Sequence, residues 1–148
     1  MRHAALRRTA AAHGATIFAI GMFTGILAGL ALTGKLKVGI PHMMLAAHLN
    51  GLLGGFWLLS LSFSLPMVRY GDVGARRLVR LTLVPVYANW AITLVASFLG
   101  VRGLELTGER TNDGVAVLLI AGVVVPSLAA ASAWAYGLWG PDPKTERA

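Results

Sequence analysis

The sequence of 148 residues contains no cysteine. Without thiols the chain cannot form disulfides, thiolate metal centres, iron–sulfur clusters or the covalent haem attachment of the C-x-x-C-H type. No G-x-S-x-G, Walker loop or zinc-ligand motif is present either, so hydrolase and ATPase functions have no support. Charge is also scarce, because Asp, Glu, Lys and Arg make up 13% of the residues, against about 25% in soluble domains. This composition indicates a membrane protein.

Charge is missing altogether from four long stretches. No Asp, Glu, Lys or Arg occurs in Thr9–Gly34, Val38–Val68, Leu81–Val101 or Gly114–Pro141. Each stretch can hold the roughly 20 apolar residues with which a helix crosses about 30 Å of hydrocarbon. The sequence therefore predicts an all-α integral membrane four-helix bundle, one domain over residues 1–148, with spans near 12–33, 41–66, 79–101 and 114–138. No acid lies within a span, which argues against a small proton-coupled antiporter.

The basic residues flank the spans. One side of the membrane would hold Arg2, Arg7, Arg8, Arg69, Arg76, Arg77, Arg80, Lys144 and Arg147. The other side would hold Lys35, Lys37, Arg102 and Arg110, diluted by acids. Because positive residues favour the cytoplasmic side, both termini are predicted to be cytoplasmic, in a bacterial-type inner membrane. The net charge of +7 then reflects the orientation of the chain in the membrane, and the expected partner of the basic residues is membrane lipid. No nucleic acid partner is expected.

Glycine is plentiful in the first two spans. Gly21, Gly25 and Gly29 recur every fourth residue, and Gly51 and Gly55 repeat the pattern in the second span. Such a stripe lets another helix approach closely, although lipid-facing glycine without consequence is the alternative. Four short spans enclose little volume, so we expect a homo-oligomer whose subunit boundaries build any cavity.

Few polar side chains lie inside the spans. The second span carries His48 and Asn50, and the third carries Tyr87 and Asn89. By the 1.5 Å rise per residue, antiparallel neighbours bring "HLN" and "YAN" to nearly the same depth, near the midplane. Polar residues at such a depth are functional by default. The alternative is a hydrogen bond that only joins helices, contributing about 0.6 kcal/mol.

His48 shares a helix face with Gly51 and Gly55. A strip without side chains beside an imidazole would let a large flat ligand lie against the helix, and haem with a histidine axial ligand fits that description. From spacing alone this is one hypothesis among several. Asn112 and Asp113 are expected at the outer mouth, where a solvated loop is the alternative, and His13 and His42 are expected at the membrane interface.

Several motifs occur in a familiar order. The segment "AAHLNGLLGGFWLL", then "YANW", "GERTNDG" and "PSLAAASAW", resembles the small membrane isomerases typified by hydroxylaminobenzene mutase, with styrene oxide isomerase as a more distant branch. The N-terminal "RHAALRRTAAAHG" matches the same pattern, so the resemblance covers nearly the whole chain. It implies a four-helix subunit, assembled into a trimer in the epoxide branch, with ferric, non-covalent haem b between subunits and His48 on the iron.

The resemblance also implies the chemistry. A redox-neutral isomerase would act on a small aromatic substrate, converting an arylhydroxylamine to an ortho-aminophenol, with haem as Lewis acid. Asn50 and Asn89 would orient the substrate, and Tyr87 could donate a proton. Pro85 and Thr93 stand where the epoxide branch has an acid and a tyrosine, which favours the arylhydroxylamine branch.

Three other functions stay open at this point. The first is an epoxide isomerase that forms aldehydes from styrene-oxide-like substrates. The second is a haem electron-transfer protein, which would need His13 or His42 as a second axial ligand. The third is a transporter or scaffold in which the polar groups only hold helices together.

Overall fold

The computed structural model describes residues 3–139, and within them the chain is all-α. The first three long helices are α1 (Ala4–Leu32), α2 (Pro41–Ser64) and α3 (Asp72–Leu99), with a short 3-10 turn, η1 (Leu65–Met67), after α2. The fourth combines α4 (Arg110–Leu119), a π-helical turn η2 (Ile120–Val124) and α5 (Val125–Leu138). All four are long and apolar enough to cross a membrane, so the predicted fold class is confirmed.

α1 and α3 are longer than the uncharged stretches from which their spans were predicted, whereas α2 is shorter than its own stretch. α1 has 29 residues and already includes Arg7 and Arg8, and α3 has 28 and includes Arg76 and Arg77. At 1.5 Å per residue such helices reach about 42 Å, which exceeds a hydrocarbon core of about 30 Å. Helices of this length have room for their charged first two turns outside an apolar layer of that thickness. Of the predicted topology signals, Arg2, Lys144 and Arg147 lie outside the described residues.

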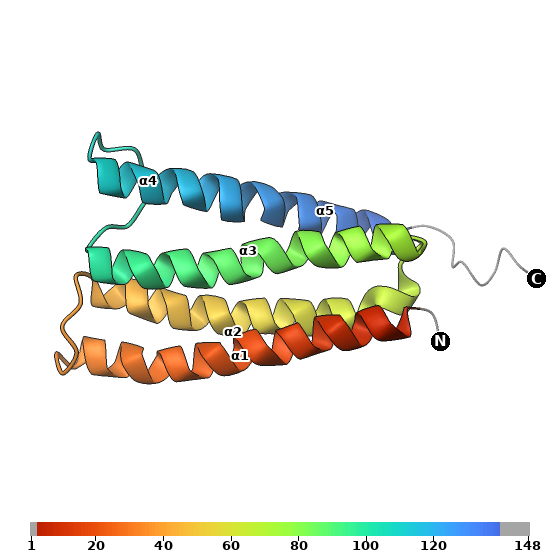
Figure 1. Ribbon diagram of the computed structural model, residues 1–148, viewed down its shortest axis with the longest axis horizontal. Helices are drawn as coiled ribbons and strands as arrows, with labels where there is room; N and C mark the ends of the chain where they lie inside the picture. The colour runs from red at the N-terminus through yellow and green to blue at the C-terminus, as the bar shows by residue number, and fades with distance from the viewer. Residues whose placement is uncertain (1–2, 140–148) are drawn as a thin grey trace, which may run out of the picture.

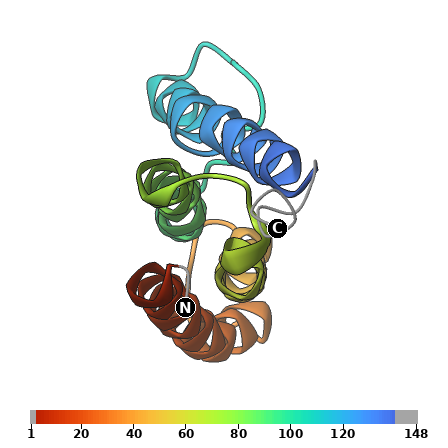
Figure 2. The same ribbon diagram turned by 90° about the vertical axis from the view of Figure 1, so that its right-hand side faces the viewer.

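The helices lie side by side, each antiparallel to the next (Figure 1). Viewed from one end, α1, α2 and α3 form a group, and the fourth helix lies on α3, away from α1 (Figure 2). The start of α1, the α2–α3 connection and the end of α5 share one end of the bundle. α2 consequently contacts both α1 and α3, and we call these two interfaces the α1–α2 seam and the α2–α3 seam.

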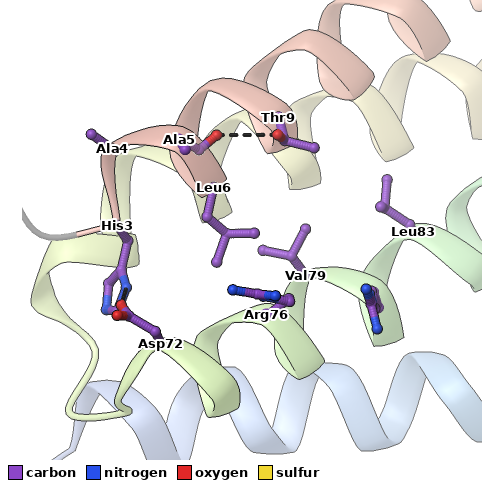
Figure 3. A pocket seen from close by; sticks show the side chains of 10 residues that line it. His3, Ala4, Ala5, Leu6, Thr9, Asp72, Arg76, Val79 and Leu83 are labelled. Atoms are coloured by element: carbon purple, nitrogen blue, oxygen red, sulfur yellow. Dashed lines mark hydrogen bonds and ion pairs between the residues drawn. The ribbon is translucent and has the colours of Figure 1, made fainter.

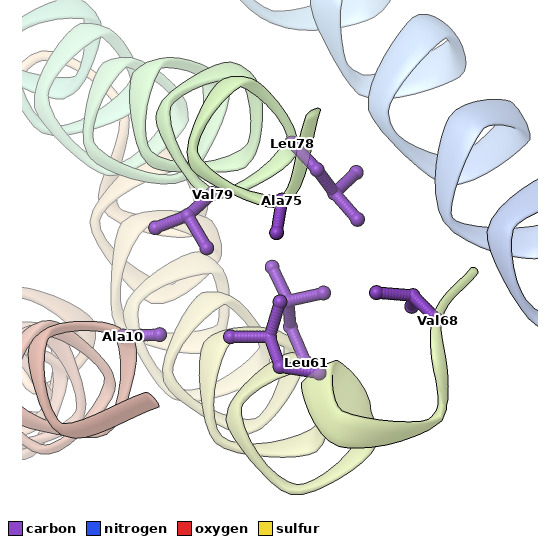
Figure 4. Packing of buried hydrophobic residues seen from close by; sticks show 7 residues of the cluster. Ala10, Leu61, Val68, Ala75, Leu78 and Val79 are labelled. Atoms are coloured by element: carbon purple, nitrogen blue, oxygen red, sulfur yellow. The ribbon is translucent and has the colours of Figure 1, made fainter. Parts of the chain in front are cut away.

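The starts of α1 and α3 are joined by an ion pair. His3 Nδ1 lies 2.7 Å from the Asp72 carboxylate, and the His3 side chain is buried (Figure 3). Nearby, small and branched apolar side chains close the first turns of the bundle (Figure 4). This cluster consists of Ala10, Leu61, Leu65, Val68, Ala75, Leu78 and Val79, all buried. It holds the charged end of α3 against α1 and α2.

Candidate functional site

A polar network joins α2 to α3 inside the membrane-spanning region. The Asn50 side-chain amide donates to Asn89 Oδ1 at 3.1 Å and to Thr93 Oγ1 at 3.1 Å. The predicted meeting of "HLN" and "YAN" at one depth is therefore confirmed for these two asparagines. Asn89 Nδ2 and Asn50 Oδ1 have no partner within residues 3–139 and remain accessible. The network thus leaves one amide donor and one amide acceptor for another molecule.

Tyr87 faces α1 instead of α2. Its hydroxyl lies 3.1 Å from His13 Nδ1, and the two rings meet edge-on with centroids 5.8 Å apart. One turn further along α3, Trp90 Nε1 donates to Thr24 Oγ1 at 3.0 Å. The sequence predicted His13 at the membrane interface and did not indicate its contact with Tyr87. The position of His13 inside the first uncharged stretch could have indicated a partner within the bundle.

His48 lies in the seam between α1 and α2. Its Nδ1 is 2.8 Å from the Gly21 carbonyl oxygen. A carbonyl can only accept, so Nδ1 donates this hydrogen bond, and in the neutral imidazole Nε2 is then the ring nitrogen without a proton. Nε2 has no partner in the described chain and is accessible. Metal-bound histidines usually donate their second ring N–H to a carbonyl or carboxylate in this way, so the orientation suits a metal ligand.

Glycine in α1 makes room for this imidazole. A Cβ added at Gly25 would lie 2.8 Å from both Cε1 and Nδ1 of His48, closer than real Cβ atoms approach other heavy atoms. The predicted close packing at Gly21 and Gly25 therefore takes the form of a contact between α1 and α2. Gly29, the third glycine of the stripe, has no heavy atom within 4 Å of such a Cβ.

Gly51 and Gly55 do not form the platform for a flat ligand that their spacing predicted. A Cβ on Gly51 would lie 2.6 Å from Gly21 Cα, and one on Gly55 would lie 2.7 Å from Phe18 Cβ. Both glycines are buried beneath α1. We correct that prediction: helix packing occupies the strip, because two backbones without side chains approach most closely there.

One subunit therefore separates the predicted site residues. His48 lies between α1 and α2, Asn50 and Asn89 lie between α2 and α3, and Tyr87 lies between α1 and α3. His48 and Asn50 are two residues apart, which turns their side chains about 200° around α2. The imidazole contacts α1 and the amide contacts α3. Within residues 3–139, no group of three or more His, Cys, Asp or Glu side chains could hold a metal ion.

Asn112 and Asp113 organise the loop before α4. Asn112 accepts from Gly103 N at 2.9 Å, and the Asp113 carboxylate accepts from the backbone N–H groups of Thr107 and Gly108 at 2.7 and 3.0 Å. Glu109 caps the helix in the same region. Hydrogen bonds from the backbone N–H groups of Asn112 and Thr111 hold the pKa of its carboxyl below the usual value. The three side chains are engaged with the loop and the start of α4.

Comparison with known proteins covers almost the whole chain. The family model described as styrene oxide isomerase matches residues 6–140, which include every residue of both seams. Hydroxylaminobenzene mutase HabB of Ectopseudomonas oleovorans is 31% identical over 134 residues, covering 86% of this chain and 76% of that protein. No solved structure matches.

Proposed function

As a member of the styrene oxide isomerase family the chain is a membrane isomerase, and we propose that it rearranges a small arylhydroxylamine to an ortho-aminophenol. The reaction moves one oxygen from nitrogen to a ring carbon and needs no external oxidant. The observation that carries this proposal is the Asn50–Asn89–Thr93 network, which presents an unused amide donor at mid-span. The similarity to a hydroxylaminobenzene mutase supports the same substrate class.

We propose ferric haem b, bound without a covalent link, as the cofactor. His48 fits it as axial ligand because Gly21 fixes the tautomer that leaves Nε2 unprotonated, and Gly25 gives the ring its space. When bound, the haem supplies a Lewis acid that withdraws charge from the substrate oxygen. Because α1 covers Gly51 and Gly55, this strip offers no surface for the flat face of the cofactor, and we propose that another subunit provides it. A homo-oligomer, with a trimer as the resemblance implies, provides such a boundary.

The side chains of this chain would bind and orient the substrate. Thr93 donates to the Asn89 backbone and accepts from Asn50, so the Asn50 amide holds Asn89 Oδ1 in place. Asn89 Nδ2 is then directed to donate to the substrate oxygen as negative charge develops there. Tyr87, oriented by His13, holds a proton near the same level. The surrounding hydrocarbon limits capture of a cationic ring by bulk water.

A paired turnover assay tests the function. Haem-replete protein is incubated separately with phenylhydroxylamine and with styrene oxide, and we expect ortho-aminophenol to be the main product. Preferred turnover of styrene oxide to the aldehyde would instead establish epoxide isomerisation, the second candidate, which the matching family model favours. Consumption of neither substrate would refute both. A six-coordinate, low-spin haem that cycles readily would favour electron transfer.

The imidazole of His48 and the amide of Asn50 contact opposite neighbours of α2, so we propose that His48 of one subunit works with Asn89 of the adjacent subunit. A complementation experiment tests this shared site. His48→Ala and Asn89→Ala variants are each expected to be inactive, and their coexpression should restore about a quarter of the wild-type activity. That fraction arises because random assembly of a symmetric ring pairs an intact His48 with an intact Asn89 of the adjacent subunit at one boundary in four. Mixing the separately purified variants without subunit exchange is the control. If coexpression restores nothing, the two residues act within one subunit.

The membrane and its orientation complete the proposal. We propose a bacterial-type cytoplasmic membrane with both termini inside, because Arg76, Arg77 and Arg80 lie at the end of the bundle where α1 begins. The orientation is tested in sealed vesicles by protease digestion at the α2–α3 connection, or by labelling of a cysteine introduced there. We expect the connection to be accessible only from the cytoplasmic side.

A further inference from the structure

A cavity of about 550 Å³ opens between the first turns of α1 and α3, at the charged end of the bundle. Figure 3 shows Leu6 and Val79 pointing toward one another across it, with His3 and Asp72 at one edge. Its lining includes two basic side chains, Arg76 and Arg80, and three apolar side chains, Leu6, Val79 and Leu83. The proposed isomerase chemistry uses none of these residues.

The polar part of the cavity attracts negative charge. Arg76 and Arg80 are one helical turn apart on α3, and neither has an ion pair or side-chain hydrogen bond within residues 3–139. Like charges at this spacing repel one another, and an anion between them removes the repulsion. Asp72 is the one acid in the lining, and its carboxylate is engaged with His3 at 2.7 Å.

The backbone adds to this attraction. Ala4, Ala5 and Leu6 also line the cavity, and they form the first turn of α1, whose N-terminal N–H groups have no acceptor within the helix. No side chain caps this turn. The positive end of the helix dipole therefore lies at the same cavity as the two guanidinium groups.

The apolar part distinguishes a lipid from a free anion. Arg80 directly precedes the uncharged stretch Leu81–Val101, so the cavity lies where headgroups meet hydrocarbon. Leu6 and Leu83 are half-buried and give the cavity an accessible apolar wall, while Val79 is buried in the packed cluster beneath it. A free phosphate would use the basic residues only, whereas a phospholipid would also cover this apolar wall.

We propose that this cavity binds the phosphate ester of an anionic phospholipid, with the headgroup between Arg76, Arg80 and the start of α1 and an acyl chain along Leu6 and Leu83. The site lies at the subunit surface and is separate from the isomerase seams. A phospholipid bound there contacts both α1 and α3 and so stabilises the packing of their charged ends.

Native mass spectrometry of the full-length protein in neutral detergent tests the proposal. Phosphatidylglycerol is titrated against phosphatidylcholine with the same acyl chains, and against inorganic phosphate. We expect phosphatidylglycerol to be retained preferentially and to raise the melting temperature, while phosphate displaces it only weakly. Arg76→Gln should weaken its retention about fivefold, as expected for one basic residue at the membrane surface.

Arg77→Gln is the matched control. Arg77 is the adjacent residue, carries the same charge and does not line this cavity. Equal loss of phosphatidylglycerol in the two variants would overturn the site and leave only a general surface attraction. Full displacement by inorganic phosphate would overturn the lipid assignment in favour of a free anion. Because binding is measured without haem or substrate, failure here is distinguishable from failure of the proposed isomerase function.

Discussion

Replacing Gly25 with alanine is expected to disturb the imidazole of His48 directly. The added Cβ would lie 2.8 Å from both Cε1 and Nδ1, whereas ordinary contacts begin at 3.4 Å, so the ring must move by about 3.4 − 2.8 = 0.6 Å. A displacement of that size away from α1 would lengthen the 2.8 Å bond between Nδ1 and the Gly21 carbonyl beyond the usual limit of about 3.2 Å. The tautomer that frees Nε2 would lose its support.

The expected result is a loss of haem affinity of about 10- to 100-fold, the usual cost of removing a hydrogen bond that orients a metal-bound histidine. Haem titration followed by the Soret band gives the affinity, and turnover of phenylhydroxylamine should fall in proportion to haem occupancy. The fold should persist, because alanine favours a helix over glycine by about 1 kcal/mol.

Gly29→Ala is the matched control for this experiment. It makes the same chemical change one turn along the same stripe, but the new Cβ meets no heavy atom within 4 Å. Haem affinity and turnover should stay at the wild-type values in this variant. If both variants bind haem as the wild type does, the contact between α1 and His48 does not govern the cofactor site. If both lose it equally, glycine flexibility rather than the position of the ring is responsible.

Three further substitutions probe other parts of the structure. Gly51→Ala should lower the stability of the protein by about 1–3 kcal/mol, measured by thermal unfolding in detergent, because its Cβ would lie 2.6 Å from Gly21 Cα and backbone cannot give way as a side chain can. Tyr87→Phe removes the hydroxyl bonded to His13 and should lower kcat on the order of 10²-fold at unchanged haem content, as expected for loss of a positioned acid; unchanged kcat would exclude the phenol from the chemistry. The lowered pKa of Glu109 means that its capping contribution is present above the unfolded-state pKa and is lost as pH falls through the folded-state pKa. The protection of the Thr111 and Asn112 amides against hydrogen exchange, taken relative to the intrinsic exchange rate at each pH, should therefore decrease in acid. Glu109→Gln should remove this pH dependence, and a persistent acid effect would assign it to another group.

The sequence by itself determined the membrane class, the four helices and the depth of the polar groups. These properties depend on lengths along the chain: an uncharged stretch must match the hydrocarbon thickness, and a fixed rise per residue sets the level of each side chain. For that reason Asn50 and Asn89 were correctly expected to meet.

Only the tertiary structure decided which face of each helix meets which neighbour. From the sequence alone, the strip at Gly51 and Gly55 is as compatible with a flat cofactor as with another helix. In the tertiary structure α1 packs against this strip. The same packing turned His48 toward Gly21 and brought His13 to Tyr87. Helices in lipid are apolar on nearly every side, so the sequence pattern carries little information about rotation around the helix axis, and close backbone packing with a few interhelical hydrogen bonds sets it instead.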